Sequence, residues 1–220
     1  MRQVTKPYSL AIFDLDGTLA DSFPWFLQVL NEVARDFNFR QIGEDDIPAL
    51  RRAGAREILK RLDVPLWKVP RIASHMRRIK REHIDDIPLF PGVPAMLQAL
   101  HASGVRLALV SSDNEANARR QLGPNVTWFS DFCCGASLFG KAAKFRRMVR
   151  RAGIAPPAAI AIGDEARDLD AARAAGIAFG GVAWGYADAA SLRAREPQAF
   201  FDSVADIPRL LCSPRPTSSS

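Results

Sequence analysis

The fold is decided at Phe13-Asp14-Leu15-Asp16-Gly17-Thr18, where a buried strand runs into a turn that carries two acidic side chains. The apolar run 9–13 lies between Pro7 and Gly17, and it predicts a short strand that is buried on both faces. An Asp-Gly-Thr ending is by itself typical of a turn. What the two acids can do therefore depends on the groups that other segments bring to the same place.

Downstream, one local pattern recurs, in which a helix ends at a glycine and an apolar strand follows. Glycine is favoured just beyond a helix C-terminus because it adopts the left-handed conformation at low cost. The glycines are Gly104, Gly153 and Gly176, and strands are expected at 107–110, 159–162 and 178–184, with another within 126–133. Helices are expected at 91–103, 114–122, 141–152 and 167–175. This alternation predicts an α/β fold with a doubly wound parallel sheet.

The segment from residue 21 to residue 86 breaks this alternation. Apolar residues recur there at helical spacing, beginning with Phe23, Phe26, Leu27, Leu30 and Val33, and further helices are expected at 53–62 and 67–83. We therefore predict an all-helical insertion after the first strand. The core would comprise 1–20 and 87–212, the insertion 21–86, and a disordered tail 213–220.

The composition excludes several classes of protein. The chain of 220 residues is 48% hydrophobic, which is enough for a sizeable core, and no apolar run is long enough to span a membrane. Three cysteines, with Cys133 and Cys134 adjacent, form neither a disulfide framework nor a metal-binding pattern, and the three histidines are scattered. No signal-like segment precedes the first strand, so we expect a reduced, cytoplasmic protein.

The formal charge of +6 is concentrated in the predicted insertion. Residues 51–81 contain eleven Lys or Arg and two acids, whereas the rest of the chain is slightly acidic. Such a run is most often a solvated helix face, but above a phosphate site it would steer anionic substrates inward, with Arg51, Arg52 and Arg56 as candidates. Neither a nucleic-acid-binding module nor an aromatic platform accompanies it, so no nucleic-acid partner is expected.

Three of the predicted strands are each followed by side chains that can bind a metal ion or a phosphate. These side chains are Asp14 and Asp16 after the first strand, Ser111 and Ser112 after the second, and Asp164 and Asp168 after the third. Lys141 stands at the start of the helix that precedes the third strand. Because ligands of an open parallel sheet bind beyond the carboxyl ends of its strands, these groups are expected to converge at one edge.

This set of groups favours phosphoryl chemistry. Clustered carboxylates repel one another unless a cation binds, and oxygen ligands without Cys or His favour a hard ion such as Mg²⁺. Such an ion would neutralise charge on a phosphate. One carboxylate can act as the nucleophile, while a second acid protonates the leaving oxygen and then activates water. A serine hydroxyl and a lysine ammonium would hold the phosphoryl group.

In their order along the chain, these segments resemble the four motifs of the haloacid dehalogenase superfamily. The matching stretches are Asp14-Leu15-Asp16-Gly17-Thr18-Leu19, Ser111, Lys141 and Gly163-Asp164-Glu165-Ala166-Arg167-Asp168. The resemblance covers nearly the whole chain. The helical insertion between the first two motifs, together with Val182-Ala183-Trp184-Gly185-Tyr186, is similar to the C1-capped subfamily that includes phosphoglycolate phosphatases.

The resemblance implies a role for each acidic residue. Asp14 would be the nucleophile and a metal ligand. Asp16 would be the general acid and base, with its backbone carbonyl on the metal. Asp164 would bind Mg²⁺ directly, and Asp168 would support the metal site. The implied activity is magnesium-dependent hydrolysis of a small phosphorylated metabolite through an aspartyl-phosphate, with a helical cap that selects the substrate.

The resemblance also implies a set of groups that hold the phosphoryl group. Ser111 would bind it, with backbone groups of Leu15 and Ser112 nearby. Lys141 would offset its charge, although the family's third motif often reads Lys-Pro and Lys144 is an alternative. Arg51 and Arg52 would contact the substrate from the insertion.

One rival motif overlaps Lys141. Residues 135–141 match the first seven positions of a nucleotide-binding P-loop, but Ala142 stands where the metal-binding hydroxyl is required. We therefore assign Lys141 to the Asp14 site.

Other activities remain as alternatives within the resemblance. Phosphonatases use a cap lysine to form a Schiff base, for which Lys60 and Lys68 are candidates, and phosphomutases differ in cap residues that this sequence does not identify. Dehalogenases lack the second acid, so Asp16 argues against them. The complete set of acids, hydroxyl and lysine disfavours a non-catalytic phosphate-binding or scaffolding protein. The sequence carries no signal for an oligomeric state.

Overall fold

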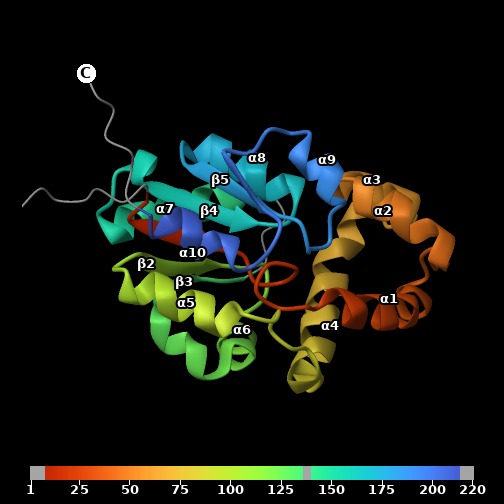
Figure 1. Cartoon of the computed structure of the whole chain (residues 1–220). Helices are drawn as coiled ribbons and strands as arrows, with labels where there is room; N and C mark the ends of the chain where they lie inside the picture. Colours follow the sequence, from red (N-terminus) through yellow and green to blue (C-terminus); the bar gives the residue numbers. More distant parts are fainter. Residues whose placement is uncertain (1–7, 136–139, 214–220) are drawn as a thin grey trace, which may run out of the picture.

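The core of the protein is a parallel sheet, drawn as arrows in Figure 1. The computed structural model describes residues 8–135 and 140–213. Within them the sheet has six strands in the order β3-β2-β1-β4-β5-β6. The strands are β1 (Leu10–Phe13), β2 (Arg106–Val110), β3 (Phe129–Cys133), β4 (Ala159–Gly163), β5 (Ala178–Val182) and β6 (Ala199–Phe201). The predicted parallel sheet is confirmed, and the strand expected within 126–133 corresponds to β3.

Strand β1 shows why helices cover both faces of the sheet. Leu10 and Ile12 belong to one apolar cluster, and Ala11 and Phe13 belong to another, because successive side chains of a strand point to opposite faces. The helices of the first cluster are α7 (Lys141–Ala152), α8 (Ala166–Ala175) and α9 (Ala189–Arg193), and those of the second are α5 (Val93–Ala102), α6 (Glu115–Leu122) and α10 (Asp206–Leu211). The predicted doubly wound α/β fold is therefore confirmed.

The strand order places β1 where the chain reverses its direction across the sheet. Strand β1 pairs with β2 on one side and with β4 on the other. From there β2 and β3 extend to one edge, whereas β4, β5 and β6 extend to the other. Ligands of open α/β sheets bind at such a switch point, beyond the carboxyl ends of the strands. The ends of β1, β2 and β4, which precede the predicted site residues, are therefore adjacent.

A helical insertion, residues 21–86, lies beyond these strand ends, and the arrowhead of β4 points toward it in Figure 1. Its helices are α1 (Phe23–Phe37), α2 (Ile47–Arg52), α3 (Ala55–Arg61) and α4 (Val69–Glu82). They enclose an apolar cluster of their own around Leu30, Leu62 and Val69. No strand forms between residues 21 and 86, all of which are described. The predicted helical insertion after the first strand is confirmed, while the division into domains at residues 20 and 86 stays a prediction.

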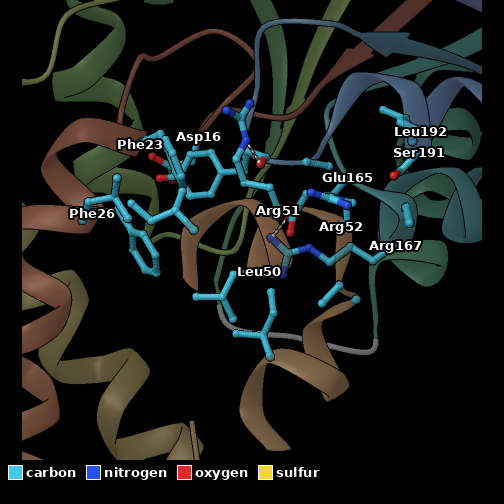
Figure 2. A pocket seen from close by; sticks show the side chains of 18 of the residues that line it. Asp16, Phe23, Phe26, Leu50, Arg51, Arg52, Glu165, Arg167, Ser191 and Leu192 are labelled. Atoms are coloured by element: carbon cyan, nitrogen blue, oxygen red, sulfur yellow. Dashed lines mark hydrogen bonds and ion pairs between the residues drawn. The ribbon is translucent and has the colours of Figure 1, made fainter. Parts of the chain in front are cut away.

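A cavity of about 380 Å³ lies between part of the helical insertion and the core (Figure 2). Its wall includes Phe23 and Phe26 of α1 and Leu50 of α2. From the core, Asp16 and Tyr186 complete part of the wall. A molecule in this cavity would therefore contact both the helical insertion and the turn that follows β1.

The remaining expectations concern the cysteines, the tail and membrane association. Cys133, Cys134 and Cys212 are free thiols. The predicted disordered tail, 213–220, lies outside the described residues except for Ser213. Among residues 8–135 and 140–213, each helix is too short or too polar to cross a bilayer.

Candidate active site

Asp14 is buried at the carboxyl end of β1. Its backbone N–H donates to the carbonyl of Ile162 at 2.9 Å, which extends the pairing of β1 with β4 by one residue. Its Oδ1 accepts a hydrogen bond from the backbone N–H of Leu15 at 2.9 Å. Burial raises the pKa of Asp14, while the ammonium group of Lys141 opposes this rise. The strand end therefore holds this carboxyl group in one orientation, in surroundings where water cannot stabilise its charge.

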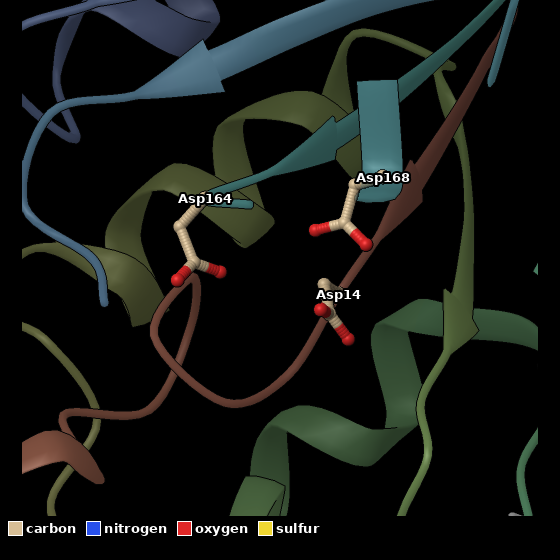
Figure 3. A group of neighbouring side chains, drawn as sticks. All are labelled: Asp14, Asp164 and Asp168. Carbon is tan, nitrogen blue, oxygen red and sulfur yellow. The ribbon is translucent and has the colours of Figure 1, made fainter. Parts of the chain in front are cut away.

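Two further carboxyl groups face Asp14, as Figure 3 shows. Asp164 follows β4, and Asp168 lies in the first turn of α8. One oxygen atom from each of Asp14, Asp164 and Asp168 lies within 4.8 Å of the other two. Burial, followed by the charges of Glu165, Asp168 and Asp14, raises the pKa of Asp164 well above its ordinary value. Three buried carboxyl groups at this separation are electrostatically unfavourable unless a cation lies among them.

The carboxyl group of Asp164 is held from both sides by hydrogen bonds. The hydroxyl of Thr18 donates to Oδ1 at 2.9 Å, and the backbone N–H of Tyr186 donates to Oδ2 at 2.8 Å. Close packing also requires glycine at two positions. A Cβ atom at Gly17, whose φ is +76°, would lie 2.4 Å from Asp164 Oδ2, and one at Gly185 would lie 2.1 Å from Asp164 Cβ. The turn after β1 and the loop after β5 therefore set the position of Asp164 together.

This donor set fits a hard divalent cation. The ligand atoms offered by Asp14, Asp164 and Asp168 are all carboxylate oxygens, which Mg²⁺ prefers. Burial and then the neighbouring carboxylates raise the pKa of Asp164, and a cation bound at this group would oppose both effects. The side chain of Asp16 lies outside this cluster, so only its backbone remains available for the metal role that the resemblance implies.

Lys141 and Lys144 occupy different places, although both lie in the first turn of α7. Lys141 Nζ lies 2.7 Å from Asp14 Oδ2 and 2.6 Å from Asp168 Oδ1. Burial lowers the pKa of Lys141, but the two carboxylates outweigh this effect and raise it above the ordinary value. Lys144 Nζ instead donates to the carbonyls of Ser111 and Gly135, at 2.9 and 2.6 Å. The structure thus brings Lys141 to Asp14, while Lys144 braces the backbone after β2.

Ser111 follows β2 directly and is buried. Its hydroxyl oxygen accepts a hydrogen bond from the backbone N–H of Asp113 at 3.0 Å, which shapes the turn before α6. Ser112 is exposed. The backbone from Ser111 to Asp113 therefore curves past the end of β2, with the Ser111 side chain turned inward.

Asp16 pairs with a residue that belongs to none of the four sequence motifs. Lys80, near the end of α4, places Nζ 2.6 Å from Asp16 Oδ1 and 3.0 Å from Asp113 Oδ2. Only 4% of Lys80 is exposed. Burial raises the pKa of Asp16, but the ammonium group of Lys80 outweighs this effect, and the pKa is lowered overall. The acid predicted to act on the leaving group is thus held by a lysine from the helical insertion.

A weak signal for Lys80 exists in the helical pattern of α4. Val69, Met76 and Lys80 are spaced by seven and four residues, so they fall on one face of the helix. A lysine on the face that starts with a buried valine is expected either to extend to solvent or to meet a buried acid. The pattern alone does not distinguish these two outcomes.

The arginines predicted to bind substrate lie beside the cavity. Arg51 donates from Nε to the carbonyl of Tyr186 at 3.0 Å and from Nη2 to the carbonyl of Gly185 at 2.9 Å. It therefore joins α2 to the loop after β5. Arg52 lines the cavity and donates from Nε to the carbonyl of Pro48, at 3.1 Å, within its own helix. Arg56 is exposed on α3.

The lysines considered for a Schiff base lie elsewhere. Lys60 is exposed on α3. Lys68 donates to the carbonyl of Phe37 at 2.8 Å. Residues 136–139 of the P-loop-like stretch lie outside the described residues, and Lys141, its last residue, faces Asp14.

Comparisons with known proteins agree with this geometry. Residues 11–182 match the family described as haloacid dehalogenase-like hydrolase. The phosphoglycolate phosphatase of Synechococcus elongatus is 32% identical over 198 residues, covering 89% of this chain and 93% of that protein. A haloacid dehalogenase-like hydrolase from Streptococcus pneumoniae superposes with a TM-score of 0.76 at 20% identity, covering 91% of this chain and 97% of that one. CbbY from Rhodobacter sphaeroides, in complex with phosphate, superposes with a TM-score of 0.70 at 20% identity, covering 91% of this chain and 96% of that one.

These matches differ in what they establish. The two solved structures share the fold of this chain. The sequence relative and the family match extend over most of the chain, and they confirm both the predicted resemblance and the predicted class of enzyme, a phosphatase-type hydrolase. The family match and the sequence relative show that the protein belongs to the haloacid dehalogenase-like hydrolase family, and the carboxyl groups that converge at the end of β1 agree with this.

Proposed function

We propose that this protein hydrolyses a small phosphate monoester with Mg²⁺, through an aspartyl-phosphate formed on Asp14. The observation that carries the proposal is the position of Asp14, whose Oδ2 lies 2.7 Å from Lys141 Nζ in a cluster with Asp164 and Asp168. Hydrolysis of phosphate monoesters is very slow without catalysis, so the site must position the nucleophile and compensate negative charge. These carboxylates and the ammonium group meet both requirements.

In the first step, a carboxylate oxygen of Asp14 attacks phosphorus and the ester oxygen leaves. Lys141 compensates negative charge beside the nucleophile, and the Ser111 hydroxyl and backbone N–H groups near Leu15 and Ser112 hold the phosphoryl oxygens. Asp14, Asp164 and the backbone carbonyl of Asp16 would hold Mg²⁺, with Asp168 in support. When bound, the ion would supply positive charge that neutralises charge developing on the phosphoryl group.

Asp16 acts on the leaving group and then on water. It lies on the wall of the cavity, on the side where the alcohol half of the ester would lie. The ion pair with Lys80 keeps Asp16 ionised in the free protein, so Asp16 must take up a proton as the negatively charged ester binds. It gives this proton to the departing alkoxide, and the resulting carboxylate later takes a proton from the water that attacks the aspartyl-phosphate. Lys80 keeps this side chain in place through its ion pair of 2.6 Å.

The helical insertion serves as a cap in this proposal. It covers the strand ends, closes one side of the cavity and supplies Lys80. A cap that excludes water protects the aspartyl-phosphate until the alcohol has left. The phosphoglycolate phosphatase from Synechococcus elongatus and the phosphate-bound CbbY protein support a small phosphorylated metabolite as the substrate class.

The test is phosphate release from a panel of phosphorylated metabolites with Mg²⁺, with Asp14→Asn as the inactive variant. Asparagine keeps the shape of aspartate but is a far weaker nucleophile, so activity should fall by about 10³-fold or more. Asp45→Asn, which changes an exposed aspartate away from the cavity, is the matched control and should retain activity. Full phosphatase activity in Asp14→Asn would overturn the proposal.

A further inference from the structure

The cavity beside Asp16 has an apolar wall on the side of the helical insertion. Phe23, Phe26 and Leu27 of α1 and Leu50 of α2 face it, as Figure 2 shows for the labelled residues. Each of these four side chains is only half-buried. Apolar surface that stays in contact with water is unfavourable by about 25 cal/mol per Å², so a ligand that covers this wall gains the corresponding free energy.

The volume of the cavity decides what size of group it accepts. It measures about 380 Å³, within the range of small-molecule sites, which begins near 300 Å³. A benzene-sized group needs a cavity of about 150 Å³. The space beside Asp16 is therefore large enough for an aryl or branched alkyl group in addition to the ester oxygen.

Of the four guanidinium groups on the wall, those of Arg51, Arg167 and Arg195 are engaged with other parts of the protein, whereas Arg52 donates only from Nε, to the carbonyl of Pro48. Arg51 binds the carbonyls of Tyr186 and Gly185. Arg167 pairs with Glu165, and Arg195 pairs with Asp170 at 2.7 Å. These arginines hold the helical insertion and the core loops in place. Arg52, whose terminal nitrogens make no hydrogen bond or ion pair within the described residues, is the one of the four left for a carboxylate of a substrate, so the wall offers no pair of free arginines to a compact dianion.

From these observations we infer that the cavity binds the alcohol half of the substrate, and that this half is apolar. The preferred ester would be the phosphate of an aryl-substituted or branched aliphatic alcohol, rather than a compact dianion such as 2-phosphoglycolate. The inference rests on the proposed function and adds the substrate class. The ester oxygen would lie at Asp16, and the apolar group would lie against α1 and α2.

The test compares esters whose leaving groups are all primary alcohols, so that their chemistry is similar. We would measure kcat/KM of the wild-type protein with Mg²⁺ for benzyl phosphate, 2-methylpropyl phosphate, methyl phosphate and 2-phosphoglycolate. The values for the first two should exceed those for the last two by at least tenfold. Equal values, or a preference for 2-phosphoglycolate, would overturn the inference.

Two substitutions test whether the wall of this cavity causes the preference for benzyl phosphate over methyl phosphate. Leu50→Gln makes the wall polar at nearly constant size, and it should reduce the ratio of the benzyl to the methyl phosphate value at least tenfold. Trp67→Gln changes a tryptophan that is 77% exposed outside this cavity, and it should leave both values unchanged. A ratio that is the same in Leu50→Gln and the wild type would overturn the assignment of the site.

The outcomes also separate the inference from the proposed function. A wild-type protein that hydrolyses methyl phosphate and 2-phosphoglycolate in an Asp14-dependent manner, without a benzyl preference, supports the proposed function and overturns the inference. A wild-type protein that hydrolyses none of the four esters overturns the inference, and the proposed function is then decided by the wider panel of phosphorylated metabolites. The comparison of esters uses only the wild-type protein, so it stands even where a variant does not fold.

Discussion

Lys80 Nζ lies 2.6 Å from Asp16 Oδ1 and 3.0 Å from Asp113 Oδ2, so one side chain of α4 joins two carboxylates of the core. The two acids follow β1 and β2, and they are brought together by the adjacency of those strands. The helical insertion is thus attached to the core by an ion pair at the candidate active site itself. The position of the insertion and the position of Asp16 are linked through this contact.

We expect Lys80→Met to impair both stability and turnover. Methionine fills similar space but leaves Asp16 and Asp113 without their cation, and an uncompensated buried charge costs about 3–5 kcal/mol. Thermal unfolding should therefore occur at a lower temperature. The value of kcat for any ester that the wild type hydrolyses should fall at least about tenfold, because Asp16 is no longer held beside the leaving group.

Lys60→Met is the matched control for this prediction. It removes a positive charge from the same helical insertion at an exposed position, so melting temperature and kcat should stay near the wild-type values. Equal kcat values for Lys80→Met and Lys60→Met at saturating substrate would show that Lys80 has no role at the site.

Gly185→Ala should displace Asp164. The new Cβ atom would lie 2.1 Å from Asp164 Cβ and 2.6 Å from Asp164 Cγ, which is far below van der Waals contact. Because Asp164 is a proposed metal ligand, phosphate release should fall about 100-fold or more while the protein stays folded by circular dichroism. Gly43→Ala is the control, since no atom lies within 4 Å of its added Cβ. Wild-type activity in Gly185→Ala would contradict the placement of Asp164.

Binding of Mg²⁺ should raise the melting temperature of the wild type but not that of Asp164→Asn. A ligand at 100 times its dissociation constant adds about 2.7 kcal/mol, which corresponds to a rise of about 5–10 °C for a chain of this size. Asparagine preserves the shape of Asp164 and removes its charge. Differential scanning calorimetry across a Mg²⁺ titration measures the shift, and Asp45→Asn, at an exposed position, should behave as the wild type does. The same shift in Asp164→Asn would exclude Asp164 as a ligand.

Cys134 should react unusually slowly with thiol reagents. Burial, followed by the charge of Glu115, raises the pKa of this thiol to about 12. Only the thiolate reacts, so the rate of alkylation by iodoacetamide should rise about tenfold per pH unit up to pH ~11 in the folded protein. In the unfolded chain the rate should level off near the ordinary thiol pKa of about 8.5. Peptide mass spectrometry measures alkylation at Cys134. A rate that levels off near pH 8.5 in the folded protein would refute the prediction.

The elements that local sequence patterns predict best are the buried strands and the helices that end at glycine. The runs that became β1, β2, β4 and β5 are apolar throughout, because helices cover both faces of the sheet. Strand β6 was missed, since Ala199–Phe201 is only three residues long and its pairing with β5 is a tertiary contact. The same patterns placed the helical insertion between the first strand and the rest of the sheet.

What the sequence by itself determined is the chemistry at the strand ends. The acids after β1 and β4 and the serine after β2 are set by their places in the chain, and the parallel sheet brings them to one edge. Only the tertiary structure decided which lysine meets which acid. Lys141 and Lys144 are three residues apart but face Asp14 and Ser111 respectively, and Lys80 reaches Asp16 across 64 residues. The physical reason is that a long side chain pairs with the charge that packing places near it, and sequence periodicity specifies a helix face without specifying its partner.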